Sequence, residues 1–218
     1  SDLGEVIYKI LAAKRVILLH QSKDGPVWIG TESGLYKFDQ KTRSLIEIET
    51  GREASTASAN PIFWRVAEAQ NGDIWLGTMH NGLFFWPREF ALQNDTSELK
   101  QVTKATSRIG PIYAIEIDNL GFPWCSTNSG LIRINPSTKQ STLVSTKYGI
   151  QNHKFDFAVS HKDSQGLLYF GGRTGYTKFN PSLFSINFSP SPLRFTKVVF
   201  AESTRLKQVN SILFNHLQ

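Results

Sequence analysis

The chain has 218 residues, of which 40% are hydrophobic and 12% aromatic, and its formal net charge is +6. Length and composition allow one or two domains with a substantial core. The single cysteine excludes an internal disulfide, and no run of about 18 apolar residues is present that could span a membrane as a helix.

One motif recurs four times along the chain. Each copy begins at a glycine-containing turn, continues through an aromatic residue in a short apolar strand, and ends in a second hairpin strand. The aromatic anchors are 47, 49 and 45 residues apart, and a period in the forties is typical of stacked repeat units. The anchor and glycine positions of this motif are Trp28, Gly30, Trp75, Gly77, Trp124, Tyr169 and Gly171.

Each copy predicts a small antiparallel sheet. An apolar run lies upstream of the hairpin, at residues 16–20, 62–67, 112–117 and 157–161, and a weaker run follows it at 45–48, 99–102 and 143–145. Stacked units of this kind predict an all-β fold of β-propeller blades, with four four-stranded antiparallel repeats in a partial or small propeller. We expect the propeller over residues 1–189, with blades at about 13–50, 60–103, 110–146 and 155–188 and with residues 1–12 as an extra outer strand.

The remaining segments and side chains suggest no reaction centre. Residues 51–61 and 86–99 are expected to be inter-strand loops, and Cys125, within an anchor strand, a packed core thiol. The basic residues are scattered, which favours a solvated surface over a nucleic-acid partner; they include Lys37, Arg43, Arg88, Lys139 and Lys178. No nucleophile elbow, phosphate-binding loop or metal-binding spacing occurs, so we expect no catalytic residue, no metal and no cofactor.

The course of the chain predicts a binding face. If the upstream run is the innermost strand, the Asp-Gly turns lie on one face of the propeller, and the other turns and the inter-blade connections lie on the opposite face. Polar groups there, with Phe63 and Phe157 also near the central opening, suit a carbohydrate or another polar small molecule, although solvated turns are an open alternative. The candidate ligand-binding residues are Glu32, Arg52, Asn60, Trp64, His80, Asn81, Arg108, Tyr113, Asn128, His153 and Arg173.

The repeats, of the form D-G-x-I-W-x-G-T-x-x-G-L-x-x-x-D, resemble two-component regulator propeller repeats, which occur in the sensor regions of bacterial membrane-bound histidine kinases and diguanylate cyclases. The segments G-I-Q-N-H-K-F-D and L-L-Y-F-G-G-R-T-G-Y-T-K-F-N-P resemble the last blade of those sensors. The resemblance covers about residues 16–190. Residues 190–218 then resemble the linker and the truncated start of the immunoglobulin-like triple-tyrosine domain, with Arg194–Ala201 as its first strand.

This resemblance implies a periplasmic sensor region of a two-component-type receptor, which binds a small molecule or an oligosaccharide and joins the membrane only through segments outside this chain. With four units, we expect either a closed four-bladed ring or a symmetric dimer of half-rings. Two alternatives remain open. One is a propeller lyase of the streptogramin-lyase type, for which only Glu32, His80 and His153 are available, and the other is a protein-interaction scaffold.

Overall fold

The computed structural model describes residues 14–50, 61–103, 110–144 and 155–184, and the backbone at 198–199 and 208–209. The chain divides into two compact units, Ser1–Leu183 and Phe184–Gln218. In the second unit, β16 (Val198–Val199) pairs with β17 (Gln208–Val209). The outer strand expected at residues 1–12 lies outside the described residues.

The first unit consists of antiparallel sheets in which consecutive strands pair, so the predicted all-β fold of propeller blades is confirmed. Blade 1 contains β1 (Val16–Gln21), β2 (Val27–Thr31), β3 (Gly34–Asp39) and β4 (Ser44–Ile48), and blade 2 contains β5 (Phe63–Glu68), β6 (Ile74–Thr78), β7 (Leu83–Trp86) and β8 (Lys100–Thr103). Blade 3 contains β9 (Ala114–Ile117), β10 (Pro123–Thr127), β11 (Gly130–Ile134) and β12 (Ser141–Val144). Within the described residues, blade 4 contains β13 (Phe155–Lys162), β14 (Leu168–Gly172) and β15 (Gly175–Phe179).

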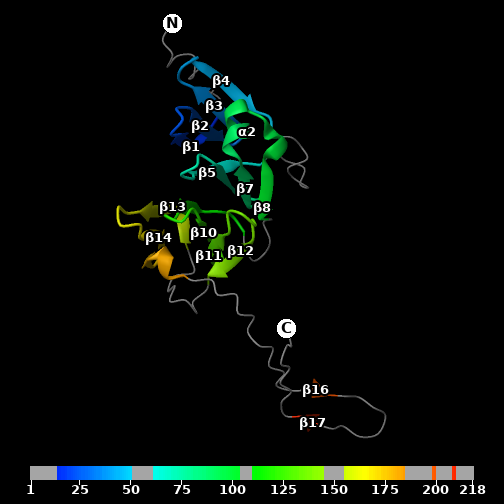
Figure 1. Ribbon diagram of the computed structural model, residues 1–218, viewed down its shortest axis with the longest axis vertical. Coiled ribbons are helices and arrows are strands. Elements are labelled where there is room, and N and C mark those ends of the chain that lie inside the picture. Colours follow the sequence, from blue (N-terminus) through cyan, green and yellow to red (C-terminus); the bar gives the residue numbers. More distant parts are fainter. Residues whose placement is uncertain are drawn as a thin grey trace. The chain divides into compact units, whose positions relative to one another are not determined.

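The blades are stacked in chain order. The innermost strand of each blade contacts that of the next: β1 contacts β5, β5 contacts β9, and β9 contacts β13. Figure 1 shows blade 1 and blade 4 at opposite ends of this stack. The four blades therefore form an open array, and the closed four-bladed ring that we considered from the sequence is not what the structure shows.

The core lies between blades, because the anchor side chains point toward the following blade. Trp28 of blade 1 packs against Trp86 of blade 2, with ring centroids 5.4 Å apart. Trp124 of blade 3 packs in the same way against Phe179 of blade 4, at 4.8 Å. Both faces of a middle sheet are thus covered, which explains why its strands are apolar without polar alternation.

The glycine two residues after the anchor is required by the closeness of the next blade. A Cβ atom on Gly30 would lie 2.3 Å from the carbonyl oxygen of Phe63, and one on Gly77 would lie 2.8 Å from Ile112 Cγ2. Each neighbour belongs to the following blade. The glycine of the Trp-x-Gly motif is therefore needed because the chain of the next blade passes too close to the anchor strand to leave room for a side chain.

Cationic side chains cover the anchor rings. For Lys37 this corrects the expectation of a solvated surface, whereas Arg43, Arg88 and Lys178 are exposed as expected. Lys37 is cross-strand partner of Trp28 and is only 5% exposed, with its Nζ 5.6 Å from the centre of the Trp28 ring. Lys178 occupies the same position opposite Tyr169 in blade 4, at 5.2 Å, but is exposed. Where another blade follows, as blade 2 follows blade 1, such a cation is therefore part of the interface between blades.

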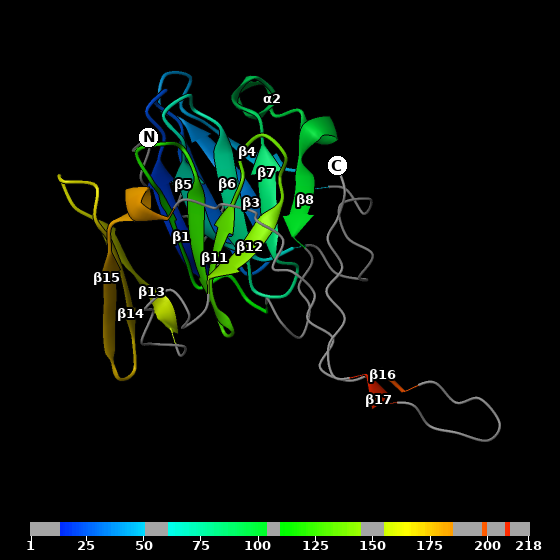
Figure 2. The ribbon, with the colours of Figure 1, turned by 60° about the horizontal axis from the view of Figure 1, so that its bottom comes forward.

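A short helix occupies the connection that was expected to be a loop between β7 and β8. Helix α2 (Arg88–Gln93) begins after Pro87, whose fixed φ suits a helix start, and ends at Asn94, which has a left-handed φ of 61°. A 3₁₀ turn, η2 (Thr96–Glu98), follows before β8. Figure 2 shows α2 at one end of the strands of blade 2. Ala91 is the buried residue that holds the helix in the core cluster between blades 1 and 2.

Candidate functional site

Seven of the eleven candidate ligand-binding residues lie in described segments; Arg52, Asn60, Arg108 and His153 lie outside them. Glu32, His80, Asn128 and Arg173 are exposed in the turns between the second and third strands of blades 1 to 4. In the described part of the chain no hydrogen bond joins any two of these four residues. Asn81 is half-buried, and its carbonyl accepts a hydrogen bond from Gln101 Nε2 at 2.5 Å. The turn residues alone therefore form no assembled site.

The other two candidates, Trp64 and Tyr113, lie where the inner strands of blades 2, 3 and 4 come together, and each contacts residues of blade 4. Trp64 is 7% exposed and packs edge-on against Phe157 of β13, with ring centroids 4.4 Å apart. Arg65 lies over the same Phe157 ring, with Cζ 3.7 Å from its centre. We call Trp64, Arg65, Tyr113 and Phe157 the mouth cluster. By contrast, Phe63 is fully buried between blades 1 and 2 and does not line an opening.

A single carbonyl oxygen links the three blades at the mouth cluster. The oxygen of Tyr113 accepts a hydrogen bond from Arg65 Nε at 2.6 Å and another from the Ala158 amide at 3.1 Å. Ala158 has a left-handed φ of 63°, which is strained for a residue with a side chain, and it sits in an irregular part of β13. Backbone strain of this kind often accompanies a functional site, so the conformation of Ala158 supports the mouth cluster as a candidate site.

The guanidinium of Arg65 is half-buried and pairs with no carboxylate among the described residues. Its Nη1 donates to the carbonyl oxygen of Trp64, while its Nη2 is buried and has no hydrogen-bond partner there. The indole Nε1 of Trp64 is also buried and unpartnered in the described segments. Burial lowers the pKa of Arg65 to about 10, so the group remains charged at neutral pH.

The sequence contained a signal for Arg65 that was not used. Arg65 is the cross-strand partner of Gly77, the glycine of the Trp-x-Gly motif. The residue opposite the equivalent position is Leu18 in blade 1 and Ala114 in blade 3. An arginine at a position that is apolar in the neighbouring repeats indicates a role other than packing.

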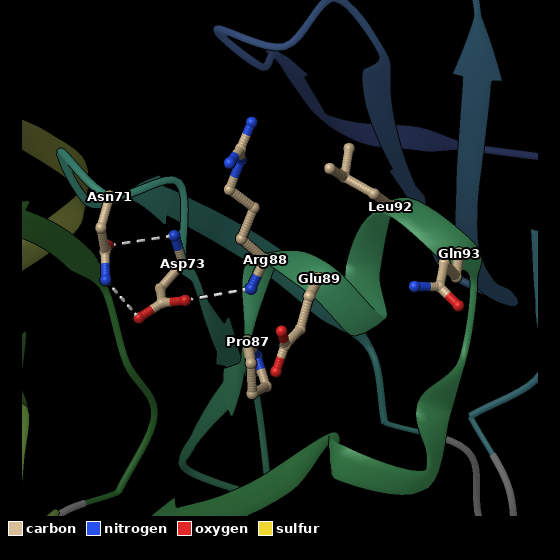
Figure 3. Close-up of a pocket in the computed structure, with 7 residues that line it drawn as sticks. All are labelled: Asn71, Asp73, Pro87, Arg88, Glu89, Leu92 and Gln93. Atoms are coloured by element: carbon tan, nitrogen blue, oxygen red, sulfur yellow. Dashed lines mark hydrogen bonds between the residues drawn. The ribbon is translucent and has the colours of Figure 1, made fainter.

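A polar pocket of about 530 Å³ lies on the face of the Asp-Gly turns, opposite the one expected to bind a ligand (Figure 3). Hydrogen bonds join some of its lining groups: Asn71 Nδ2 donates to Asp73 Oδ2 at 2.7 Å, and the Arg88 amide donates to Asp73 Oδ1 at 3.0 Å. Figure 3 shows that the first of these bonds lies within the turn and that the second ties the turn to the start of α2. The pocket is lined by Asn71, Asp73, Pro87, Arg88, Glu89, Leu92 and Gln93, none of which was a ligand-binding candidate.

The described residues do not assemble a familiar reaction centre. Ser22, His20 and Glu68 lie together, but Ser22 Oγ donates to Glu68 Oε2 at 2.6 Å and so is not activated by the imidazole. His20 Nε2 lies 3.5 Å from the same carboxylate oxygen. Cys125 is fully buried, as predicted, and burial raises the pKa of its thiol. Among the described residues no group of His, Cys, Asp and Glu has metal-binding geometry.

The molecule is a β-propeller-type array of blades with a cationic and aromatic cluster on its inner strands. No family model matches the chain. Histidine kinase P4 from Formosa agariphila is 25% identical over 232 residues, an alignment that covers 86% of this chain and 17% of the kinase. The extracellular domain of the putative hybrid two-component system BT4673 from B. thetaiotaomicron has a TM-score of 0.62 and 22% identity, over 77% of this chain and 23% of that domain.

Virginiamycin B lyase from Staphylococcus aureus is also similar, with 18% identity and a TM-score of 0.49 over 76% of this chain and 55% of the lyase, which is too distant to bear on activity. The chain thus spans less than a quarter of the kinase and of the BT4673 domain. At these identities the structural similarity shows the fold. No helix among the described residues is both long enough and apolar enough to cross a bilayer.

Proposed function

We propose that this chain is part of the sensor region of a bacterial two-component-type receptor and that it binds a polar small molecule, such as a carbohydrate, at the mouth cluster. The observation that carries the proposal is the convergence of Trp64, Arg65, Tyr113 and Phe157 from three blades, with two buried N–H donors that have no partner among the described residues. Aromatic rings beside a few directed polar groups suit saccharide recognition.

The relatives support the receptor context. One is a histidine kinase, and another is the extracellular domain of a putative hybrid two-component system. We infer from these and from the repeat motif that the blades are two-component regulator propeller repeats and that residues 190–218 begin a triple-tyrosine domain. The same context favours a periplasmic location, with membrane attachment through segments outside this chain.

A site that spans blades can generate a signal. A ligand changes the equilibrium between two arrangements of a receptor only if it binds one of them more tightly. The mouth cluster draws Trp64 and Arg65 from blade 2, Tyr113 from the segment entering blade 3, and Phe157 from blade 4. Any movement of these blades alters the contacts available to the ligand.

A thermal-shift screen of the chain against neutral sugars, uronic acids and their oligomers tests the proposal, because a ligand of the folded state raises the melting temperature. Phe157→Ala should weaken binding of any ligand found, whereas Leu120→Ala should not, because Leu120 is an exposed apolar residue in the turn between β9 and β10, on the opposite face. The absence of any hit across the panel, or equal effects of both substitutions, would contradict the proposal.

A lyase is the main enzymatic alternative, and His80 tests it. His80 is exposed in the turn between β6 and β7. In a lyase that uses it as general base, His80→Ala should abolish turnover of a streptogramin substrate. In a sensor region, no turnover is present to be lost, and ligand affinity changes little because His80 is not a member of the mouth cluster.

Self-association remains a prediction that solution mass can test. The outer face of blade 4 exposes Val159 and Tyr176, which are 49% and 70% accessible. These side chains, with Tyr169 and Gly171, line an apolar hollow of about 230 Å³. If this face mediates dimer formation, Tyr176→Glu should shift a dimer toward monomer in analytical ultracentrifugation. A wild-type chain that is monomeric at all accessible concentrations would refute self-association.

A further inference from the structure

The mouth cluster presents two N–H groups that require an acceptor. Arg65 Nη2 and Trp64 Nε1 are buried, and neither has a hydrogen-bond partner among the described residues. Leaving a buried donor unpaired is unfavourable, and more so when the group is charged. Trp28 Nε1 also lacks a partner among the described residues, but it lies between blades 1 and 2. At the mouth cluster two such donors occupy adjacent residues of one inner strand beside the partly exposed ring of Phe157, which favours a bound group as their acceptor.

The charge of Arg65 indicates which kind of acceptor is missing. The carbonyl oxygens of Tyr113 and Trp64 accept hydrogen bonds from Nε and Nη1, but both acceptors are neutral. Burial is the cause of the lowered pKa of Arg65, about 10, and no carboxylate in the described segments pairs with it. Because the guanidinium is only half-buried, its charge does not by itself require a counter-ion. An anion nevertheless pairs with a guanidinium N–H more strongly than a neutral acceptor does, so we expect the missing acceptor of Nη2 to be an anion.

The structure assigns a carboxylate-binding subsite to Arg65 and Trp64, and hence an acidic saccharide, a uronic acid or an oligomer that contains one, to the mouth cluster. A carboxylate is planar, presents two acceptor oxygens and pairs well with a guanidinium. Two N–H groups remain for it, whereas a sulfate would leave further oxygens without donors. This inference rests on the proposed function, because it names the ligand class of the same site.

The surroundings of the subsite suit the sugar ring that would carry the carboxylate. Phe157 covers the guanidinium and is 42% exposed, so its ring can contact an apolar sugar face at the surface. It adjoins Ala158, which has a left-handed φ of 63°. Because both donor atoms are buried, a ligand can reach them only if a side chain that covers them moves. The net charge of +6 favours the approach of an anionic ligand over a neutral one.

The experiment compares acidic and neutral saccharides by isothermal titration calorimetry on the full chain at constant ionic strength. The probes are D-glucuronate, D-galacturonate and oligogalacturonides, with D-glucose, D-galactose and cello-oligosaccharides as neutral counterparts and glucose 6-sulfate as the sulfate counterpart. We expect an acidic probe to bind at least about tenfold more tightly than its neutral counterpart, as a charge-assisted hydrogen bond predicts.

Substitutions at Arg65 and Trp64 test whether the preference for acidic saccharides arises at these two residues. Arg65→Gln should remove the preference for acid, Arg65→Lys should retain only part of it because the planar fork is lost, and Trp64→Phe should weaken binding of the acid while leaving an aromatic ring in place. Arg88→Gln is the matched control, because Arg88 lies on the opposite face and pairs with Asp24, and it should leave the affinity unchanged. If Arg65→Gln does not fold, as judged by circular dichroism, Arg65→Lys and Trp64→Phe carry the test.

The outcomes separate the two proposals. Equal affinity for glucuronate and glucose, or an acid preference that survives Arg65→Lys and Trp64→Phe unchanged, overturns the carboxylate subsite but leaves a saccharide sensor intact. Binding of glucose 6-sulfate more tightly than glucuronate also overturns it, in favour of a sulfate site. If no probe of either kind binds, both the subsite and the proposed saccharide function are wrong.

Discussion

Replacement of Lys37 by methionine tests whether cations between blades hold the array together. Lys37 Nζ donates to the carbonyl oxygens of Ala91 at 3.0 Å and Leu92 at 2.6 Å, and to Asn94 Oδ1 at 3.0 Å. These acceptors lie at the carboxyl end of α2, where helix carbonyls lack partners within the helix and a cation is favourable. One lysine of blade 1 therefore secures the helix of blade 2.

The loss of stability expected for Lys37→Met depends on which of the three acceptors water can reach after the substitution. The bond to Ala91 is buried, whereas the bonds to Leu92 and Asn94 are partly buried and can be replaced by water. Loss of the buried bond lowers the free energy of unfolding by about 1.5–3 kcal/mol, because the donor is charged and the Ala91 carbonyl oxygen is left without a hydrogen bond. Burial lowers the pKa of Lys37, so relief from desolvation offsets part of this cost. With methionine filling the space, we expect a net loss of about 2 kcal/mol.

Urea denaturation monitored by tryptophan fluorescence measures this loss. With an m-value of about 2 kcal/mol per M, Lys37→Met should lower the midpoint by about 1 M. Lys178→Met is the matched control, since Lys178 has the same register opposite the anchor of blade 4 but is exposed, and it should change the midpoint far less. Equal shifts for the two variants would refute the clamp between blades.

Three further predictions follow from close contacts and burial. Gly30→Ala should destabilise the chain more in urea than Gly171→Ala, because the new Cβ would meet the backbone oxygen of Phe63 in the first case but the end of a valine side chain in the second. Burial raises the pKa of Glu116, so its contribution to stability, fully present below the unfolded pKa near 4.5, is lost as the pH rises through the folded value. The stability of Glu116→Gln relative to wild type should thus increase from pH 4 to pH 7 in urea titrations. Cys125 should react with a thiol reagent such as dithionitrobenzoate only after unfolding, because it is fully buried and its thiol pKa is raised; rapid reaction of the native chain would contradict its place in the core.

The spacing of the anchors was enough to predict the blades, because each Trp-x-Gly motif reflects a repeated contact with the next blade. The apolar run at 16–20 became β1 (Val16–Gln21), and the anchors Trp28 and Trp75 lie in buried second strands. These features depend on local strand chemistry and on a contact that recurs in successive blades. The same motif therefore appears several times in one sequence, which makes it recognisable.

Features that occur once were the ones that sequence reasoning missed. Helix α2 is short, and its stability comes from the buried Ala91 and from the clamp by Lys37 rather than from its own sequence. Lys37 was expected in solvent because its acceptors come from another blade, about 55 residues later. Arg65 went unnoticed because its partners, Tyr113 and Phe157, come from two other parts of the array.

The cations Lys37 and Arg65 have different consequences because their acceptors differ. Lys37 meets three acceptors supplied by the chain itself, so its charge stabilises one arrangement of blades 1 and 2 whether or not a ligand is present. Arg65 donates to two neutral carbonyl oxygens, and its Nη2 has no hydrogen-bond partner among the described residues. Its hydrogen bonding is therefore incomplete. An anion that completes it adds free energy only to the arrangement in which Arg65, Tyr113 and Phe157 are together. That differential affinity is what a sensor needs in order to convert binding into a change of structure.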